Sequence, residues 1–192
     1  IIMLYKNHLL VSSAIALPIM QATNTLTPLN LISLGIGALL PDIDEPESYI
    51  GRRTRGISDL INLFFGHRGL THTFYFVFAI GIFAYWIGSL ADDVSIIGIY
   101  LTFGVFLHIL EDSFSASGVR WLSPLTHKAY HFPIYTTGSL IEFSIGFISL
   151  IVIFIGFKNG ILVMEKDDLL IMENMMNLIG GIQSKVIHLF LE

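Results

Sequence analysis

Carboxylates and imidazoles lie at the boundaries of apolar segments in this sequence. Asp42 and Asp44 follow Pro41 at the end of one apolar run, and His67 and His72 precede the next. In extended backbone the alternating Asp42 and Asp44 would point to one side, and both residue types bind divalent metals. The spacing therefore predicts part of a metal site. The alternatives are ordinary turn chemistry for the two aspartates and an interfacial loop with incidental histidines.

Further candidate ligands lie at other segment ends. His108 and Asp112 are four residues apart and would share one face of a helix. His8 is at the start of the first apolar segment. It is a candidate ligand only because we expect it to lie at the same depth in a membrane as the others. The alternatives are a histidine favoured by a helix C-terminus with a solvated aspartate, and an interfacial His8. We expect Thr71 to cap the helix that follows His72.

The composition places these residues in a membrane protein. Of 192 residues, 54% are hydrophobic and 13% are charged, and the mean hydropathy is +0.74, whereas soluble domains are about 25% charged. The net charge of −5 argues against a nucleic-acid partner, which requires a basic surface. Cysteine is absent, which excludes disulfides and thiolate ligands. The N-terminus lacks a basic region followed by a small-residue cleavage site, so we expect no cleaved signal peptide.

We predict an all-α, polytopic helical bundle with about five membrane segments, which are residues 8–22, 29–40, 73–90, 94–110 and 134–157. The first two are short against the ~20 residues of a spanning helix. They span the bilayer if the threonine-rich loop between them is included in the membrane segments, or they form a re-entrant hairpin. Residues 57–65 are expected to form a short amphipathic helix at the interface. Residues 158–192 form an amphipathic tail that lies at the interface or binds a partner, with a sixth span as the alternative.

Basic residues indicate the orientation, because Lys and Arg are concentrated in cytoplasmic loops. Seven of them fall on one side of this topology and two on the other. The seven are Lys6, Arg52, Arg53, Arg55, Arg68, Arg120 and Lys128, and the two are Lys158 and Lys166. All candidate ligands fall on the side with seven, each at the end of a segment. We therefore expect a site at the cytoplasmic face.

Mixed imidazole and carboxylate ligands favour zinc, with manganese or iron as alternatives. The seven candidate ligands exceed the roughly three that hold one catalytic metal, so the site could hold one ion or two. A two-metal centre activates water and clamps both oxygens of a phosphoester. Arg52, Arg53 and Arg68 could bind a phosphate, or instead contact anionic lipid. Second-tier candidates for a general base or a substrate contact are Glu111, His127 and His131.

The order of these motifs resembles the YdjM-type family of LexA-regulated, inner-membrane-associated metal-dependent hydrolases. The resemblance rests on His8, Pro-Asp-Ile-Asp at 41–44, Ser-Tyr-Ile-Gly-Arg-Arg at 48–53, His-Arg-Gly-Leu-Thr-His at 67–72, and His108-x-x-x-Asp112 with residues 115–124. It covers about residues 3–155. Ser115 stands where the family commonly has threonine, and Thr73 where it often has serine. The resemblance implies that the metal ligands are His8, Asp42, Asp44, His67, His72, His108 and Asp112.

Together these observations predict a metal-dependent hydrolase in the inner membrane, formed by residues 1–157. Its substrate would be a lipid-like or phosphorylated molecule with an ester or phosphoester bond. One alternative is a metal-ion transporter, although transport sites usually lie near the bilayer midplane. The other is a scaffold or sensor that a closed metal site holds together. The tail at residues 158–192 could bind a protein partner.

Overall fold

The described residues form an all-helical bundle, which confirms the predicted all-α class. The computed structural model describes residues 4–66, 68–89, 92–171, 173, 174 and 177. The helices in chain order are α1 (Tyr5–Ala22), α2 (Pro28–Leu39), η1 (Leu40–Asp44), η2 (Gly51–Arg53), α3 (Arg55–Phe65), η3 (Leu70–His72), α4 (Phe74–Gly88), α5 (Asp92–Ser113) and α6 (Leu140–Lys158), where η marks a 3-10 helix. No strand is assigned within the described residues, where two isolated bridges, Ser115 with Tyr135 and Val119 with Tyr130, order the segment after α5.

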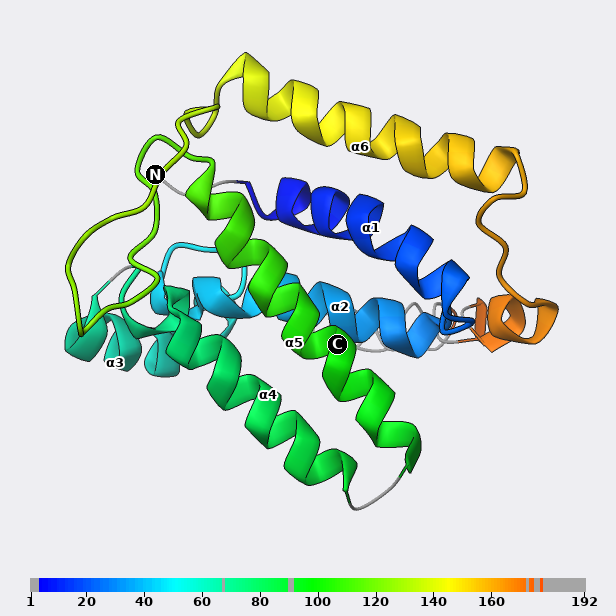
Figure 1. Ribbon diagram of the computed structural model, residues 1–192, viewed down its shortest axis with the longest axis horizontal. Helices are drawn as coiled ribbons and strands as arrows, with labels where there is room; N and C mark the ends of the chain where they lie inside the picture. Colours follow the sequence, from blue (N-terminus) through cyan, green and yellow to red (C-terminus); the bar gives the residue numbers. More distant parts are fainter. Residues whose placement is uncertain (1–3, 67, 90–91, 172, 175–176, 178–192) are drawn as a thin grey trace, which may run out of the picture.

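The five long helices alternate in direction along the chain. One end of each helix therefore lies at the same end of the molecule, on the left of Figure 1. These are the start of α1, the end of α2, the start of α4, the end of α5 and the start of α6. α5 packs along both α2 and α4, while α1 packs on α6 and α2. One group of buried apolar side chains, including Leu17, Met20, Leu34 and Leu107, fills the space between these helices. This packing fixes the relative positions of the helix ends.

Side-chain caps explain where three of the helices begin. Thr27 accepts a hydrogen bond from the backbone N–H of Asn30 and precedes a proline at the first position of α2. Ser139 caps α6 in the same way. Thr73, and not Thr71 as expected, caps α4. The expectation was wrong because the chain first makes the turn η3, which leaves the Thr71 hydroxyl free to hydrogen bond with Asp44.

Glycine allows α2 and α5 to approach until their backbones touch. A Cβ atom on Gly37 would lie 2.1 Å from the carbonyl oxygen of Leu101, and one on Gly104 would lie 2.3 Å from that of Leu34. Small residues at such crossings are typical of helix pairs in membranes, where van der Waals packing drives association. The close crossing brings the end of α2 next to the end of α5.

Two helices are long and apolar enough to cross a bilayer, through Ile96–Ser113 in α5 and Leu140–Lys158 in α6, and α4 is apolar but shorter. The helices at four of the five predicted segments closely match the predicted ranges, but the structure supports only these two as candidate spans among the described residues. The 12 residues of α2 are about 18 Å long, well short of the ~30 Å hydrocarbon core. The structure does not establish five complete spans.

The fifth segment was expected to be helical from residue 134, but α6 begins at Leu140. The chain first turns at Gly138, whose φ of +76° is readily adopted only by glycine, and Ser139 then caps the helix. Glu142, the one acid inside this apolar segment, is buried. Its carboxylate accepts hydrogen bonds from the backbone N–H groups of Leu4 (2.7 Å) and Gly138 (2.5 Å). Glu142 thus ties the start of α6 to the start of α1.

The remaining predictions concern two amphipathic segments. The helix expected at residues 57–65 is confirmed as α3. In the tail, residues 166–171 are helical, and Leu169, Leu170 and Ile171 are exposed. Most of the tail beyond residue 171 lies outside the described residues, including His188.

The α2–α5 crossing gives a test of the fold. Gly37→Ala should lower the thermal unfolding midpoint in detergent, because overpacking a close contact costs about 1–3 kcal/mol. Gly35→Ala is the matched control, since a Cβ there would lie 3.4 Å from the flexible end of Leu9 and alanine gains about 1 kcal/mol of helix propensity. Equal midpoints for the two variants would contradict the close crossing.

Candidate metal centre

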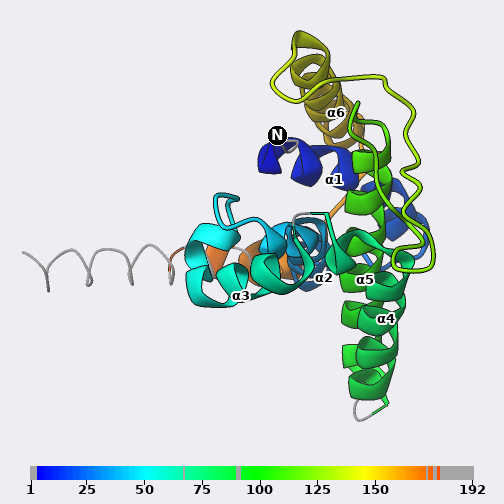
Figure 2. The same ribbon diagram turned by 90° about the vertical axis from the view of Figure 1, so that its left-hand side faces the viewer.

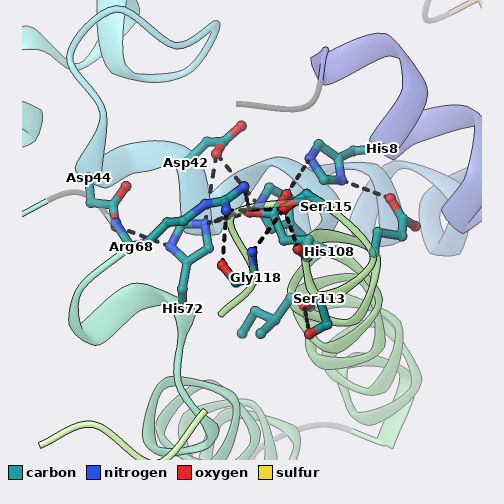
Figure 3. A network of polar contacts seen from close by, with 12 residues as sticks. His8, Asp42, Asp44, Arg68, His72, His108, Ser113, Ser115 and Gly118 are labelled. Carbon is teal, nitrogen blue, oxygen red and sulfur yellow. Dashed lines mark hydrogen bonds and ion pairs between the residues drawn. The ribbon is translucent and has the colours of Figure 1, made fainter. Parts of the chain in front are cut away.

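Five potential metal ligands meet at the end of the bundle where the helix ends gather. His8 lies in the first turns of α1, Asp42 in η1 and His72 at the end of η3, while His108 and Asp112 lie near the end of α5. Their side chains are buried, with exposed fractions of 0 to 3%. Residues more than a hundred positions apart in sequence therefore share one enclosed site (Figure 3).

Each histidine is held by a hydrogen bond at its Nδ1 atom. His8 Nδ1 lies 2.8 Å from Glu111 Oε2, and His72 Nδ1 lies 3.1 Å from Asp44 Oδ2. His108 Nδ1 lies 2.7 Å from the carbonyl oxygen of Ala38. Since a carbonyl or carboxylate oxygen accepts, these contacts place a proton on the Nδ1 atom of each ring, and the Nε2 atom lies on the opposite side of the ring. Such outer partners orient the histidines of metal sites.

The Nε2 atoms and two carboxylates face one another. His72 Nε2 lies 3.3 Å from His108 Nε2, and His108 Nε2 lies 3.5 Å from Asp42 Oδ1. Asp112 reaches the other two histidines, with Oδ2 3.5 Å from His72 Nε2 and Oδ1 3.8 Å from His8 Nε2. The rings of His8 and His108 stack with their centroids 3.9 Å apart. Lone pairs and anionic oxygens thus crowd one small volume.

The side chains form two groups, and within each group the ligand atoms lie within 4.8 Å of one another. One group is His8, His108 and Asp112, and the other is Asp42, His72 and His108. Three buried atoms, His8 Nε2, Asp42 Oδ1 and Asp112 Oδ1, have no hydrogen-bond partner among the described residues. Two nitrogens that each lie about 2.0–2.1 Å from one tetrahedral zinc are about 3.3 Å apart, which matches His72 and His108. The donor set therefore fits a divalent metal. Because His108 belongs to both groups, it connects their ligands.

Charge balance favours a cation in the same place. Four buried carboxylates, Asp42, Asp44, Glu111 and Asp112, surround the site, and one guanidinium, Arg68, lies among them. Burial raises the pKa of Asp42 to about 6, although His8 and His72 oppose the shift. Burial alone would lower the pKa of His72, but the hydrogen bond and charge of Asp44, together with the charges of Asp112 and Asp42, outweigh it and raise the pKa. A metal ion would compete there with a proton and offset the excess negative charge.

Arg68 pairs with the same oxygen of Asp112 that lies near His72. Its Nη2 lies 2.8 Å from Asp112 Oδ2, and its Nη1 donates to the carbonyl oxygen of Gly118 (2.9 Å) and to Ser115 Oγ (3.2 Å). Its backbone N–H donates to Asp44 Oδ2 at 3.0 Å. Its φ of +56° is unusual for a residue with a side chain and is maintained by these contacts. Arg68 thus connects the segment after Gly66 to the end of α5.

The other predicted site residues have different surroundings. Asp44 lies behind His72 and not among the converging ligand atoms, and Glu111 has the same relation to His8 (Figure 3 shows Asp44). Arg52 is exposed, and the exposed Arg53 stacks on Tyr49, with its guanidinium carbon 3.7 Å from the ring centroid. The exposed His127 and His131 lie in the segment between α5 and α6. His67 lies outside the described residues.

Several supporting residues were not anticipated from the sequence. Ser12 Oγ donates to Glu111 Oε1 at 2.7 Å, and the Thr71 hydroxyl contacts Asp44 Oδ2. Asn62 Nδ2 donates to the backbone oxygen of Asp44 at 2.7 Å. The four-residue spacing of His8 and Ser12 places them on one helix face, which was the available signal. No sequence signal indicated Asn62, because its partner lies in a separate helix.

The amino-acid sequence is similar to those of known proteins. The uncharacterized protein YvsG of Bacillus subtilis (strain 168) is 32% identical over 108 residues, which are 56% of this chain and 64% of YvsG. The inner membrane protein YdjM of Escherichia coli (strain K12) is 39% identical over 90 residues, which are 45% of this chain and 44% of YdjM. YdjM of Shigella flexneri gives the same values. The chain thus spans less than two thirds of each of these relatives.

No solved structure matches the chain. The sequence profile of the family described as YdjM inner membrane protein matches residues 3–178, further into the tail than the resemblance at residues 3–155. The chain therefore belongs to the YdjM family of inner membrane proteins.

Proposed function

We propose that the protein is a membrane-embedded, metal-dependent hydrolase that cleaves an ester or phosphoester of a lipid-like substrate. One observation carries the proposal, namely the convergence of three histidine Nε2 atoms and two carboxylates in a buried site. The Nδ1 contacts fix each ring before any ion binds. Preorganised ligands of this type are typical of metal centres that bind zinc, with manganese or iron as alternatives.

The residues have separate roles in this proposal. His8, His108 and Asp112 would hold one ion, and Asp42 with His72 would complete the same ion's shell or hold a second. When bound, the metal would supply Lewis-acid activation of water and of the substrate oxygen. Arg68 would keep Asp112 in place and provide positive charge beside the reacting group.

No general base is assigned. Both carboxylate oxygens of Glu111 are engaged, one by His8 and one by Ser12. His127 and His131 are exposed in the segment after α5. Glu111 therefore serves to orient His8, and the two exposed histidines stay candidates for substrate contact only.

The membrane location supports a lipid-like substrate. The site lies where α5, a candidate span, ends, and the family is one of inner membrane proteins. A bond near the headgroup of a bilayer lipid would lie at this depth. The excess of Lys and Arg on the same side supports an orientation toward the cytoplasm. Transport is less favoured, because the ligands lie at helix ends and not at the bilayer midplane.

A metal-stabilised scaffold is the second candidate, and the burial of the ligands favours it. Side chains exposed by 0 to 3% resemble those of closed structural sites. A hydrolase must admit a substrate and keep one coordination position open. Measurements of metal content and turnover together distinguish these two functions.

The ligand groups predict a pattern of metal loss. Protein purified without chelator should contain about one or two zinc ions per chain, measured by inductively coupled plasma mass spectrometry. His108→Ala should lose all bound metal, because His108 belongs to both groups. If two ions bind, His8→Ala and His72→Ala should each lose only one.

The matched control is His127→Ala, which removes an exposed histidine outside the site. It should keep the wild-type metal content. A metal-free wild-type protein that also fails to bind added zinc would contradict the metal centre.

The residues behind the histidines give a second prediction. Asp44→Asn and Glu111→Gln should weaken zinc binding about 10–100-fold without changing the stoichiometry, because each removes an anionic partner of an Nδ1–H group. Competition with a chromophoric chelator would measure the affinity. Glu47→Gln, which changes an exposed acid paired with Arg55, is the control. Equal affinities in all three variants would show that Asp44 and Glu111 do not support the ligands.

Hydrolysis itself is tested in vesicles. The reconstituted protein should release the headgroup or phosphate from a lipid phosphoester, lose this activity in EDTA and regain it with zinc. His72→Ala should abolish turnover. If zinc is bound and its removal lowers the unfolding midpoint, while a panel of lipid esters and phosphoesters is not cleaved, the scaffold is the better assignment.

A further inference from the structure

Helix α3 has the reverse of the usual amphipathic arrangement. Five large apolar side chains on this short helix, Ile57, Leu60, Leu63, Phe64 and Phe65, are between 54 and 76% exposed. Ser58, on the face opposite Leu60 and Leu63, is fully buried. A surface helix of a soluble protein buries its apolar face and exposes its polar one. α3 therefore presents its apolar face to something other than water.

The polar face of α3 attaches the helix to the backbone of the metal centre. Asn62 Nδ2 donates to the backbone oxygen of Asp44 at 2.7 Å. Arg55 pairs with Glu47 at 3.1 Å and lies 3.9 Å from Asp59 in the next turn. The contacts of α3 are chiefly with η1 and η2. These contacts fix which face points inward and which points outward.

The position of α3 indicates what covers its outer face. The helix lies at the edge of the molecule, away from α6 and at the end where the long helices meet (Figures 1 and 2). α4 begins only nine residues after α3 ends, and its exposed side chains include Phe78 and Ile82. Arg52 and Arg53 are exposed directly before α3. Apolar side chains beside a membrane helix, with arginines at one end, match a helix in the plane of a bilayer surface.

We propose that α3 lies in the interfacial layer of the membrane, with its apolar face among the acyl chains and its polar face against η1. The contact is primarily apolar, because the charge of Arg55 is matched by Glu47 and Asp59. The depth of the helix also sets the depth of the site, since Asn62 joins α3 to Asp44. The proposal concerns membrane contact alone and does not depend on hydrolysis.

Site-directed fluorescence tests this orientation. The chain contains no cysteine, so Leu63→Cys and Phe64→Cys each give one labelling position on the apolar face, and Asp59→Cys gives one on the polar side. Each variant is labelled with bimane and reconstituted in phosphatidylcholine vesicles that contain phospholipids brominated at defined acyl carbons. The labels at positions 63 and 64 should lose fluorescence, most strongly with bromines about 5–10 Å below the headgroups, while the label at position 59 should not.

Two results would overturn the proposal. If neither position 63 nor position 64 is quenched, the outer face lies in water or against another protein. If positions 59, 63 and 64 are quenched equally, the helix has no fixed orientation in the interface. Because the contact is apolar, replacing phosphatidylcholine by phosphatidylglycerol should leave the quenching unchanged, and quenching in phosphatidylglycerol alone would also contradict the proposal. Circular dichroism of each labelled variant confirms that it has folded.

Discussion

The structure depends on placing three imidazole lone pairs and two carboxylates in one buried volume. His72 and His108 have their Nε2 atoms 3.3 Å apart, and each ring is held by a hydrogen-bond partner at Nδ1. Buried imidazoles and carboxylates at these distances are costly to leave unpaired, so they must share protons or a cation. The positive charge of Arg68 beside Asp112 offsets part of the negative charge. The rest of the fold can be understood as the means of holding these groups together.

Contacts between helices, some of them far from the site, hold these groups in position. Glycines at the α2–α5 crossing bring two backbones into direct contact, and this crossing sets the distance between η1 and the end of α5. Glu142 joins α6 to α1 one turn before His8. Rigid elements of this kind are what a metal site requires, because the ligands must hold their positions to within fractions of an ångström. Polar residues of an otherwise apolar chain therefore join the helices, at the end that holds the site through Glu142 and at the opposite end through contacts such as Ser33 with the carbonyl oxygen of Ile97.

The same end of the molecule carries the apolar outer face of α3. In α3 the buried Ser58 and the Asp44-bound Asn62 lie on the inner face and large apolar side chains point outward, which is the arrangement that a bilayer favours. α6 buries only a small part of its surface inside the protein. The protein thus combines a buried polar cluster with an apolar exterior, as expected for a member of a family of inner membrane proteins.

The sequence by itself determined the helical class, the approximate helix limits and the residue types of the site. Apolar runs of helical length, the absence of cysteine and the pairing of His108 with Asp112 are local features that composition and spacing determine. The antiparallel arrangement of α1 with α2 and of α4 with α5 also follows from the short connections within each pair. These features predicted that His8, Asp42, His72, His108 and Asp112 lie at the same depth in the membrane. They did not predict the distances between these side chains.

Only the tertiary structure decided which carboxylates face the centre and which stand behind a histidine. Asp42 and Asp44 are alike in sequence, yet η1 turns one toward His108 and the other toward His72 Nδ1. The short 3-10 turn and the contacts of Asn62, Thr71 and Arg68 set that difference, and these residues come from separate elements. Likewise, the outward direction of the apolar face of α3 follows from what its polar face binds. Spacing along a chain constrains which residues share a face, whereas the choice among those residues depends on neighbours that only folding brings together.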